Sequence, residues 1–179
     1  MNPTVKKNAL NFGLLIGGIS VLYYLMGYVL MPNLFTSMSG GLVLMLLVIV
    51  INIYAVFRTR KDEGGYLVFK DAFTTFFLTW FGAGLIGTVF NLLLFNVIDP
   101  EFGSFIQEEV IRTTMQTMER FGAPEEQIDE VLEQLKNQNQ FGLATQARGF
   151  MSNSIIGAIL GLIVAALVKK NPPLFKEEA

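Results

Sequence analysis

The chain has 179 residues, of which 52% are hydrophobic and 16% are charged, and its mean hydropathy is +0.49. Ordinary soluble domains contain about 25% charged residues, so this composition predicts a membrane protein. The chain contains no Cys and no His, which excludes disulfides, Cys/His metal centres and histidine-based proton transfer. We therefore expect no catalytic residues, no cofactor and no metal site.

The first apolar region predicts two membrane spans. Fifty residues between Lys7 and Arg58 carry no charge, whereas one spanning helix needs about 20. The segment MPNLFTSMSGG, residues 31–41, divides the region with turn-forming residues. We expect a first span at 8–31 and a second at 38–57. The run is too long for a signal peptide, and no small-residue cleavage site follows it.

Two further spans follow a charged loop, RTRKDEGG. Lys70 and Asp71 stand at the border of an apolar run, which predicts a third span at 72–98. The last apolar run, GFMSNSIIGAILGLIVAALV, is closed by two lysines, and it predicts a fourth span at 149–168. The chain then divides into spans one to three (1–98), an insert (99–148), and span four with a tail (149–179).

Basic residues predict the orientation, because Lys and Arg near span ends stay in the cytoplasm. Nine of the thirteen basic residues flank the side that holds both chain ends: Lys6, Lys7, Arg58, Arg60, Lys61, Lys70, Lys169, Lys170 and Lys176. The insert carries ten acidic and four basic residues, a net charge of −6. We expect both termini in the cytoplasm and residues 99–148 in the periplasm.

The insert predicts two amphipathic helices. Asp99, Pro100 and Glu101 are typical of a helix start, and Gly122 ends that helix. A second helix begins after Pro124. It has an apolar stripe at i, i+3, i+4 and i+7, formed by Ile128, Val131, Leu132 and Leu135. The stripe needs a cover, and three alternatives exist: packing as a hairpin over the bundle, docking to a second protein, or binding to the lipid interface.

Small and polar residues inside the spans indicate helix contacts. Glycines allow close approach of helices in membranes, within one chain or across a homodimer. The glycines at suitable spacing are Gly13, Gly17, Gly82, Gly84, Gly87, Gly157 and Gly161. An amide in hydrocarbon needs a hydrogen-bond partner. Asn52, Asn91 and Asn153 therefore predict bonds between helices or, alternatively, a polar pocket for a lipid head group or small solute.

The order of these features is also informative. GGYLVFKDAF enters the third span, an acidic helical insert follows, and a Gly-rich last span ends in Lys-Lys. This order resembles a family of small bacterial four-span inner-membrane proteins catalogued as a domain of unknown function. The resemblance implies an inner-membrane setting and no catalytic residues. It also implies an accessory role near a membrane-bound glycosyltransferase that acts on polyprenyl phosphate.

The sequence predicts an all-α integral membrane protein with four transmembrane helices and an extracytoplasmic amphipathic hairpin. The expected function is non-catalytic, as an accessory or scaffolding subunit for a membrane enzyme. The alternative is a small lipid or solute transporter or carrier. Expected partners are the bilayer, another membrane protein or a second copy. Nucleic acid is not expected, because the chain has no exposed basic face.

Overall fold

The computed structural model describes residues 1–172; Lys176, used above for the orientation, lies outside them. Within these residues, six α-helices follow one another: α1 (Pro3–Val29), α2 (Met38–Asp62), α3 (Phe69–Leu93), α4 (Pro100–Arg120), α5 (Glu125–Asn137) and α6 (Leu143–Val168). A short 3₁₀ turn, η1 (Pro32–Leu34), precedes α2, and a π-helical turn, η2 (Leu94–Ile98), follows α3.

Four of these helices are long and apolar enough to cross a membrane: α1, α2, α3 with η2, and α6. The prediction of an all-helical, multi-pass membrane protein is therefore confirmed. The helices extend past the expected spans, and α6 begins at Leu143 rather than at position 149. The added residues, LATQAR, contain no Gly or Pro, so nothing in them interrupts a helix.

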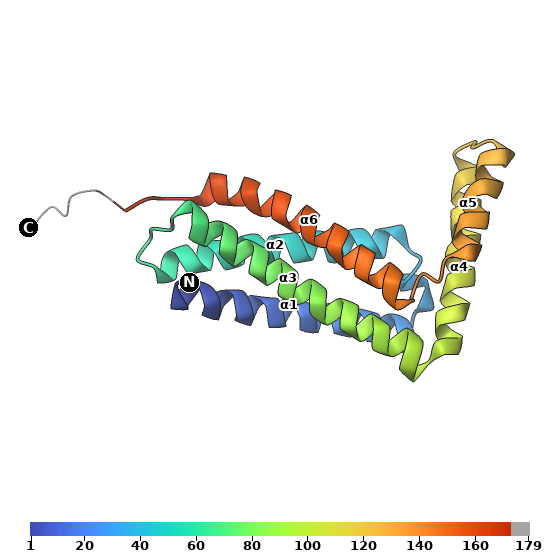
Figure 1. Cartoon of the computed structure of the whole chain (residues 1–179), viewed down its shortest axis with the longest axis horizontal. Helices are drawn as coiled ribbons and strands as arrows, with labels where there is room; N and C mark the ends of the chain where they lie inside the picture. Colours follow the sequence, from blue (N-terminus) through green and yellow to red (C-terminus); the bar gives the residue numbers. More distant parts are fainter. Residues whose placement is uncertain (173–179) are drawn as a thin grey trace, which may run out of the picture.

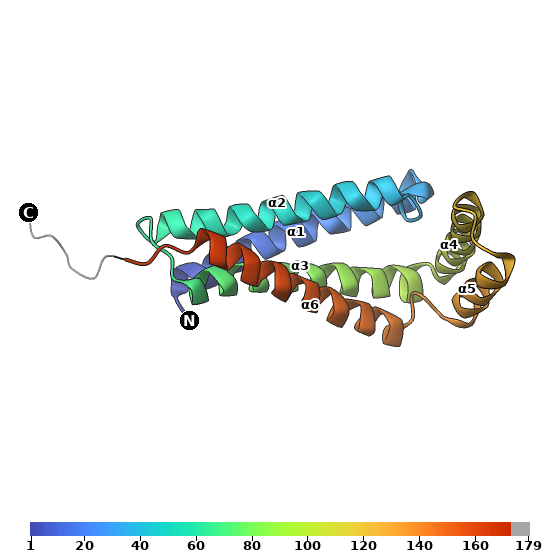
Figure 2. The ribbon, with the colours of Figure 1, turned by 90° about the horizontal axis from the view of Figure 1, so that it is seen from above.

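The four long helices form a bundle with α3 at its centre (Figure 1). α3 contacts α1, α2 and α6. The start of α1, the end of α6 and the α2–α3 loop lie at one end of the bundle, which we call the basic end (Figures 1 and 2). α4 and α5 lie at the other, which we call the insert end (Figures 1 and 2).

The basic end is closed by apolar packing and by backbone pairing. Val56, Phe76, Ala165 and Val168 are buried in one cluster that joins α2, α3 and α6. Leu67 and Lys170 exchange two backbone hydrogen bonds, each 2.8 Å long. The α2–α3 loop is thereby tied to the end of α6, which holds α2 and α6 together at this end.

The insert end is held by aromatic rings and by one helix cap. The Asp99 carboxylate accepts a hydrogen bond from the Phe102 backbone N–H at 2.9 Å and one from the Tyr28 hydroxyl at 3.0 Å. Phe95 stacks on Phe102 and on Phe141. These contacts attach the start of α4 to α1 and η2, so α4 leaves the bundle crosswise (Figure 1).

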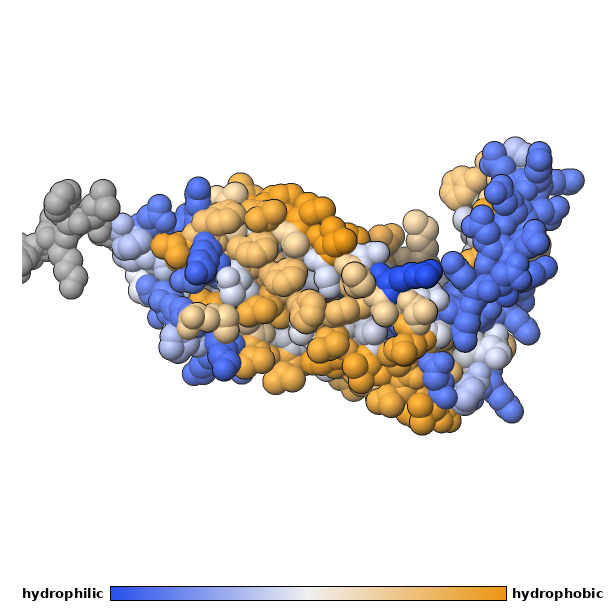
Figure 3. Space-filling view, viewed as in Figure 1, coloured by the Kyte–Doolittle hydropathy of each residue, from blue (hydrophilic) through white to orange (hydrophobic). Residues whose placement is uncertain are grey.

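The surface separates into apolar and polar zones (Figure 3). Large apolar side chains are exposed along the sides of the bundle, including Leu14 (63%), Val43 (66%) and Leu167 (81%). Hydrophilic residues cover the basic end and the α4–α5 pair (Figure 3). An apolar band between two polar caps is the surface that a bilayer requires of a spanning helical bundle.

Candidate functional site

A cavity of about 680 Å³ lies inside the bundle. We call it the wedge cavity. Side chains of α1, α2, α3 and α6 line it, together with Leu34 of η1, Phe35 and Ser37 of the turn that follows, and Gln140. Pockets that hold small organic ligands occupy about 300–1,000 Å³, so the wedge cavity is large enough for one.

The wedge cavity exists because α2 and α6 diverge toward the insert end (Figure 2). The segment that leads into α2 is anchored to α1. Phe35 lies against Gly27 of α1, and the hydroxyl of Tyr23, also on α1, donates a hydrogen bond to the Leu34 carbonyl at 2.9 Å. The start of α6 is anchored to α3, where Gly84 lies against Phe150. The two helices are thus held by different partners, and a gap remains between them.

The floor of the wedge cavity is mainly apolar. Trp80 on α3 is 6% exposed, and its indole Nε1 donates to the Asn153 carbonyl on α6 at 3.0 Å. Its ring lies directly over Gly157. Further lining residues at this depth are Ile16, Val48, Ile49 and Leu160.

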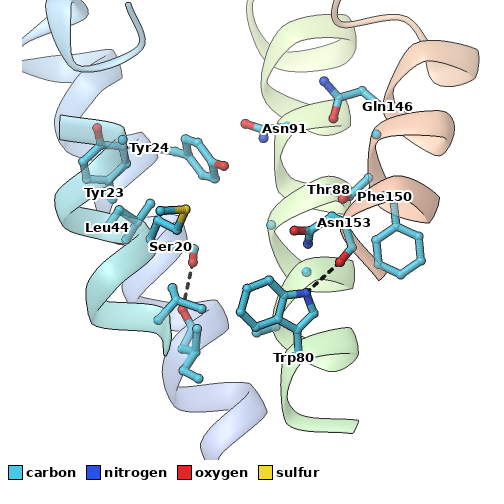
Figure 4. Close-up of a pocket in the computed structure, with 18 of the residues that line it drawn as sticks. Ser20, Tyr23, Tyr24, Leu44, Trp80, Thr88, Asn91, Gln146, Phe150 and Asn153 are labelled. Carbon is cyan, nitrogen blue, oxygen red and sulfur yellow. Dashed lines mark hydrogen bonds between the residues drawn. The ribbon is translucent and has the colours of Figure 1, made fainter. Parts of the chain in front are cut away.

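The mouth of the wedge cavity, toward the insert end, is more polar. Figure 4 shows Asn91 and Gln146 on one wall and the two tyrosines, Tyr23 and Tyr24, on the other. The Asn91 Oδ1 atom is buried and accepts no hydrogen bond from the residues that the structure describes. An unpaired buried amide oxygen is costly in an apolar setting, and rotation of the amide toward the cavity would let a bound donor pair with it.

The wedge cavity is uncharged within the described part of the chain: none of its lining residues is Asp, Glu, Lys or Arg. Residues 1–172 also contain no group of three acidic side chains able to hold a metal ion. The lining offers hydroxyls, amides and aromatic faces, which bind and orient a molecule. Apart from the Tyr23 and Tyr24 hydroxyls, the described lining residues include no His, Asp, Glu, Lys or Cys, the other side chains that commonly act as general acids or bases.

The structure places the three asparagines in different surroundings. Asn91 and Asn153 line the wedge cavity. Asn52 is fully buried outside the wedge cavity. Its amide nitrogen donates to the Val48 carbonyl of its own helix at 2.9 Å, and its Oδ1 has no partner among the described residues.

Six of the seven glycines lie at contacts within the chain. A Cβ added at Gly13 or Gly17 would meet α3, and one added at Gly157 or Gly161 would meet the Trp80 or Phe76 ring. Two more lie near lining residues of the wedge cavity: Gly84 near Asn153 and Gly87 near Tyr24. Gly82 differs, because no described atom lies within 4 Å of its added Cβ.

The apolar stripe of α5 is partly covered by α4, which α5 contacts. Ile128 is 7% exposed, whereas Val131, Leu132 and Leu135 are half-buried.

Sequence reasoning did not identify Trp80, Tyr23 and Tyr24 as residues that line a common cavity. These residues resemble ordinary membrane-span aromatics, and the sequence gives no signal that they face a common space. A partial signal is the position of Trp80: it stands eleven residues before Asn91 on the same apolar run, far from the interface where Trp is usually enriched.

Comparison with known proteins gives a family match. Searches of curated proteins and of solved structures give no match to the chain. The family described as "Protein of unknown function (DUF4199)" matches residues 11–170, which include most of α1 and all of α2 to α6. The chain therefore belongs to the DUF4199 family.

Proposed function

We propose that this protein is a non-catalytic, multi-pass protein that binds a membrane amphiphile in the wedge cavity, as a carrier or as a subunit that presents it. The observation that carries the proposal is the wedge cavity itself, about 680 Å³ between α2 and α6. It lies among helices whose outer faces are apolar. A gap between two spanning helices faces hydrocarbon, so lipid molecules are the ligands that reach it most directly.

The proposed location is the bacterial inner membrane, with both termini in the cytoplasm and residues 99–148, including α4 and α5, in the periplasm. The basic end carries most of the Lys and Arg residues, whereas the insert has a net charge of −6. This asymmetry supports the orientation through the positive-inside rule. In this orientation the mouth of the wedge cavity lies toward the outer leaflet.

Trp80 gives a direct test, because it is the single tryptophan of the chain and lines the wedge cavity. Bromine atoms on a lipid chain quench tryptophan fluorescence at short range. We expect purified full-length protein to lose Trp80 fluorescence when lipids with brominated chains are added. Native mass spectrometry of the same sample should retain a bound lipid.

A matched pair of glycine variants separates lipid in the wedge cavity from lipid around the bundle. Gly41 lines the cavity and Gly18 does not, and a Cβ meets no described atom within 4 Å at either position. Gly41→Phe should fill the mouth and reduce quenching, whereas Gly18→Phe should leave it unchanged. Equal quenching in both variants, or none in the unaltered protein, contradicts lipid binding in the cavity.

A second candidate function is the accessory or scaffolding role that the resemblance implies, beside a membrane enzyme such as a glycosyltransferase acting on polyprenyl phosphate. The feature that favours it is the hydrophilic outer face of α4 and α5, which projects beyond the bundle (Figures 1 and 3). Co-purification in mild detergent tests it. A stoichiometric partner that is lost when residues 99–142 are replaced by a short linker supports this role, and a partner-free monomer contradicts it.

A further inference from the structure

We infer that the ligand of the wedge cavity is an uncharged amphiphile whose head group donates hydrogen bonds, such as a lipid with free hydroxyls. This inference rests on the proposed function and names the ligand class of that site. The residues that carry it are the uncharged polar groups at the mouth, Asn91 and Gln146, above the apolar floor at Trp80.

The polarity of the wedge cavity changes along its length. The mouth contains amides and hydroxyls from Tyr24, Thr88, Asn91 and Gln146, whereas the floor consists of Trp80 and aliphatic side chains, with Ser20 and Asn153 between the two levels (Figure 4). A molecule that satisfies both ends has a polar head at the mouth and an apolar chain below it. The opposite orientation would bury the head against the floor, at the cost of an unsatisfied polar group.

The depth of the wedge cavity suits one lipid leaflet. Trp80 and Asn91 are eleven residues apart on α3, and at 1.5 Å per residue they are about 16 Å apart along the helix axis. The hydrocarbon core of a bilayer is about 30 Å thick, so this distance is about half of it. A chain from the outer leaflet can therefore reach the floor while its head stays at the mouth.

The charge of the lining selects the head group. None of the lining residues in the described part of the chain carries a charge, so a phosphate head group would find no counter-charge inside the wedge cavity. Arg148 is the neighbour of Gly149 in sequence, but it is exposed and does not line the cavity. Burial of an unpaired charge in an apolar site is strongly unfavourable, which favours neutral heads.

Hydrogen bonding selects among neutral heads. The Asn91 Oδ1 atom has no partner among the described residues, and the terminal torsion of an asparagine side chain is broad. Asn91 can thus turn either its oxygen or its amide nitrogen toward a ligand at the mouth. A hydroxyl group both donates and accepts, so it satisfies either arrangement of the amide.

The test compares three lipids that share the same acyl chains and differ only in head group. Diacylglycerol, phosphatidylglycerol and phosphatidylcholine carrying the same brominated chains are titrated into the purified full-length protein, and quenching of Trp80 is measured. We expect half-quenching by diacylglycerol at a mole fraction roughly threefold to tenfold lower than for either phospholipid, the effect of one hydrogen bond in a membrane protein. This comparison needs no variant, so a misfolded mutant cannot obscure it.

Two asparagine variants then assign the preference to the mouth. Asn91→Leu should raise the mole fraction of diacylglycerol that gives half-quenching, which we call the midpoint, to the value for the phospholipids. Asn52→Leu removes an amide with a similarly unpaired Oδ1 outside the wedge cavity, so it should keep the preference. Persistence of the preference in Asn91→Leu overturns the assignment of the head to the mouth.

The outcomes also separate this inference from the proposed function. Equal midpoints for the three lipids overturn the inference but keep lipid binding in the wedge cavity. A lower midpoint for phosphatidylglycerol, lost in Arg148→Gln, overturns it in favour of an anionic head bound at the rim. Absence of quenching by all three lipids overturns the proposed function itself.

Discussion

At the scale of single residues, the contacts of α3 depend on glycines, which have no side chain and so allow close approach. Gly157 is buried and lies under the Trp80 ring, so the indole occupies the space of a Cβ atom. This packing brings α6 close enough for the Asn153 carbonyl to accept the indole N–H. One glycine thus fixes both the distance between α3 and α6 and the position of the cavity floor.

Gly157→Ala should therefore destabilise the protein. The new methyl group would overlap the Trp80 ring, and over-packing of this kind costs about 1–3 kcal/mol. Displacement of the ring should also break its bond to Asn153 and shift the emission maximum of Trp80. Thermal unfolding in detergent, followed by circular dichroism, measures the first effect, and fluorescence measures the second.

Gly149→Ala is the matched control on the same helix. No described atom lies within 4 Å of its added Cβ, and alanine favours helix over glycine by up to about 1 kcal/mol. This variant should be as stable as the unaltered protein or slightly more stable. If both variants unfold at the same temperature, the contact between Gly157 and Trp80 does not set the spacing of α3 and α6.

The asparagines show how far residue-level prediction reaches. The amides of Asn91 and Asn153 are recognisable in sequence as unusual in an apolar run, and a polar pocket is one of the two outcomes that the sequence allows. The sequence does not separate them from Asn52, which bonds to its own helix. The difference depends on which helix face meets a gap, and no residue encodes that face alone.

At the scale of elements, helix limits follow local chemistry. The start of α4 is predictable because Asp99 and Pro100 form a standard N-terminal pair, and the Asp99 side chain does cap the Phe102 N–H. The end of the same helix is predictable because Gly122 adopts a φ of +73°, which disfavours other residues. The second bond of Asp99, to Tyr28, is not predictable, because it joins positions 71 residues apart.

Asp99→Ala should loosen the first turn of α4. It removes the cap, which contributes about 1 kcal/mol, and also the bond to the Tyr28 hydroxyl. Hydrogen exchange of the backbone amides near Phe102 should become faster, as measured by mass spectrometry of the protein in detergent. Exchange within α2 should not change.

Tyr28→Phe separates the two contributions. It removes the hydroxyl bond to Asp99 and keeps the cap on the Phe102 N–H. Exchange in the first turn of α4 should then stay close to that of the unaltered protein. If hydrogen exchange becomes faster by the same factor in Asp99→Ala and Tyr28→Phe, attachment to α1, rather than the cap, orders the start of α4.

At the scale of the whole molecule, the four spans are predictable because each consists of an apolar run that needs lipid whatever its neighbours do. The wedge cavity is not, because it arises from two anchors far apart in sequence. Phe35 holds the start of α2 on α1, and Phe150 holds the start of α6 on α3. Hydropathy reports which segments enter the bilayer, and it contains no information on the angle between α2 and α6.

The orientation of the bundle decides which leaflet the wedge cavity meets, and the absence of native cysteines makes it directly measurable. Gln134 lies on α5 and Lys61 near the end of α2, and both are exposed. If basic residues keep the chain ends in the cytoplasm, Gln134→Cys should react with a membrane-impermeant maleimide in intact spheroplasts. Lys61→Cys should react only after the membrane is permeabilised. The reverse pattern would place the mouth of the wedge cavity, with Asn91, toward the inner leaflet, and the ligand would then enter from lipids of the cytoplasmic side.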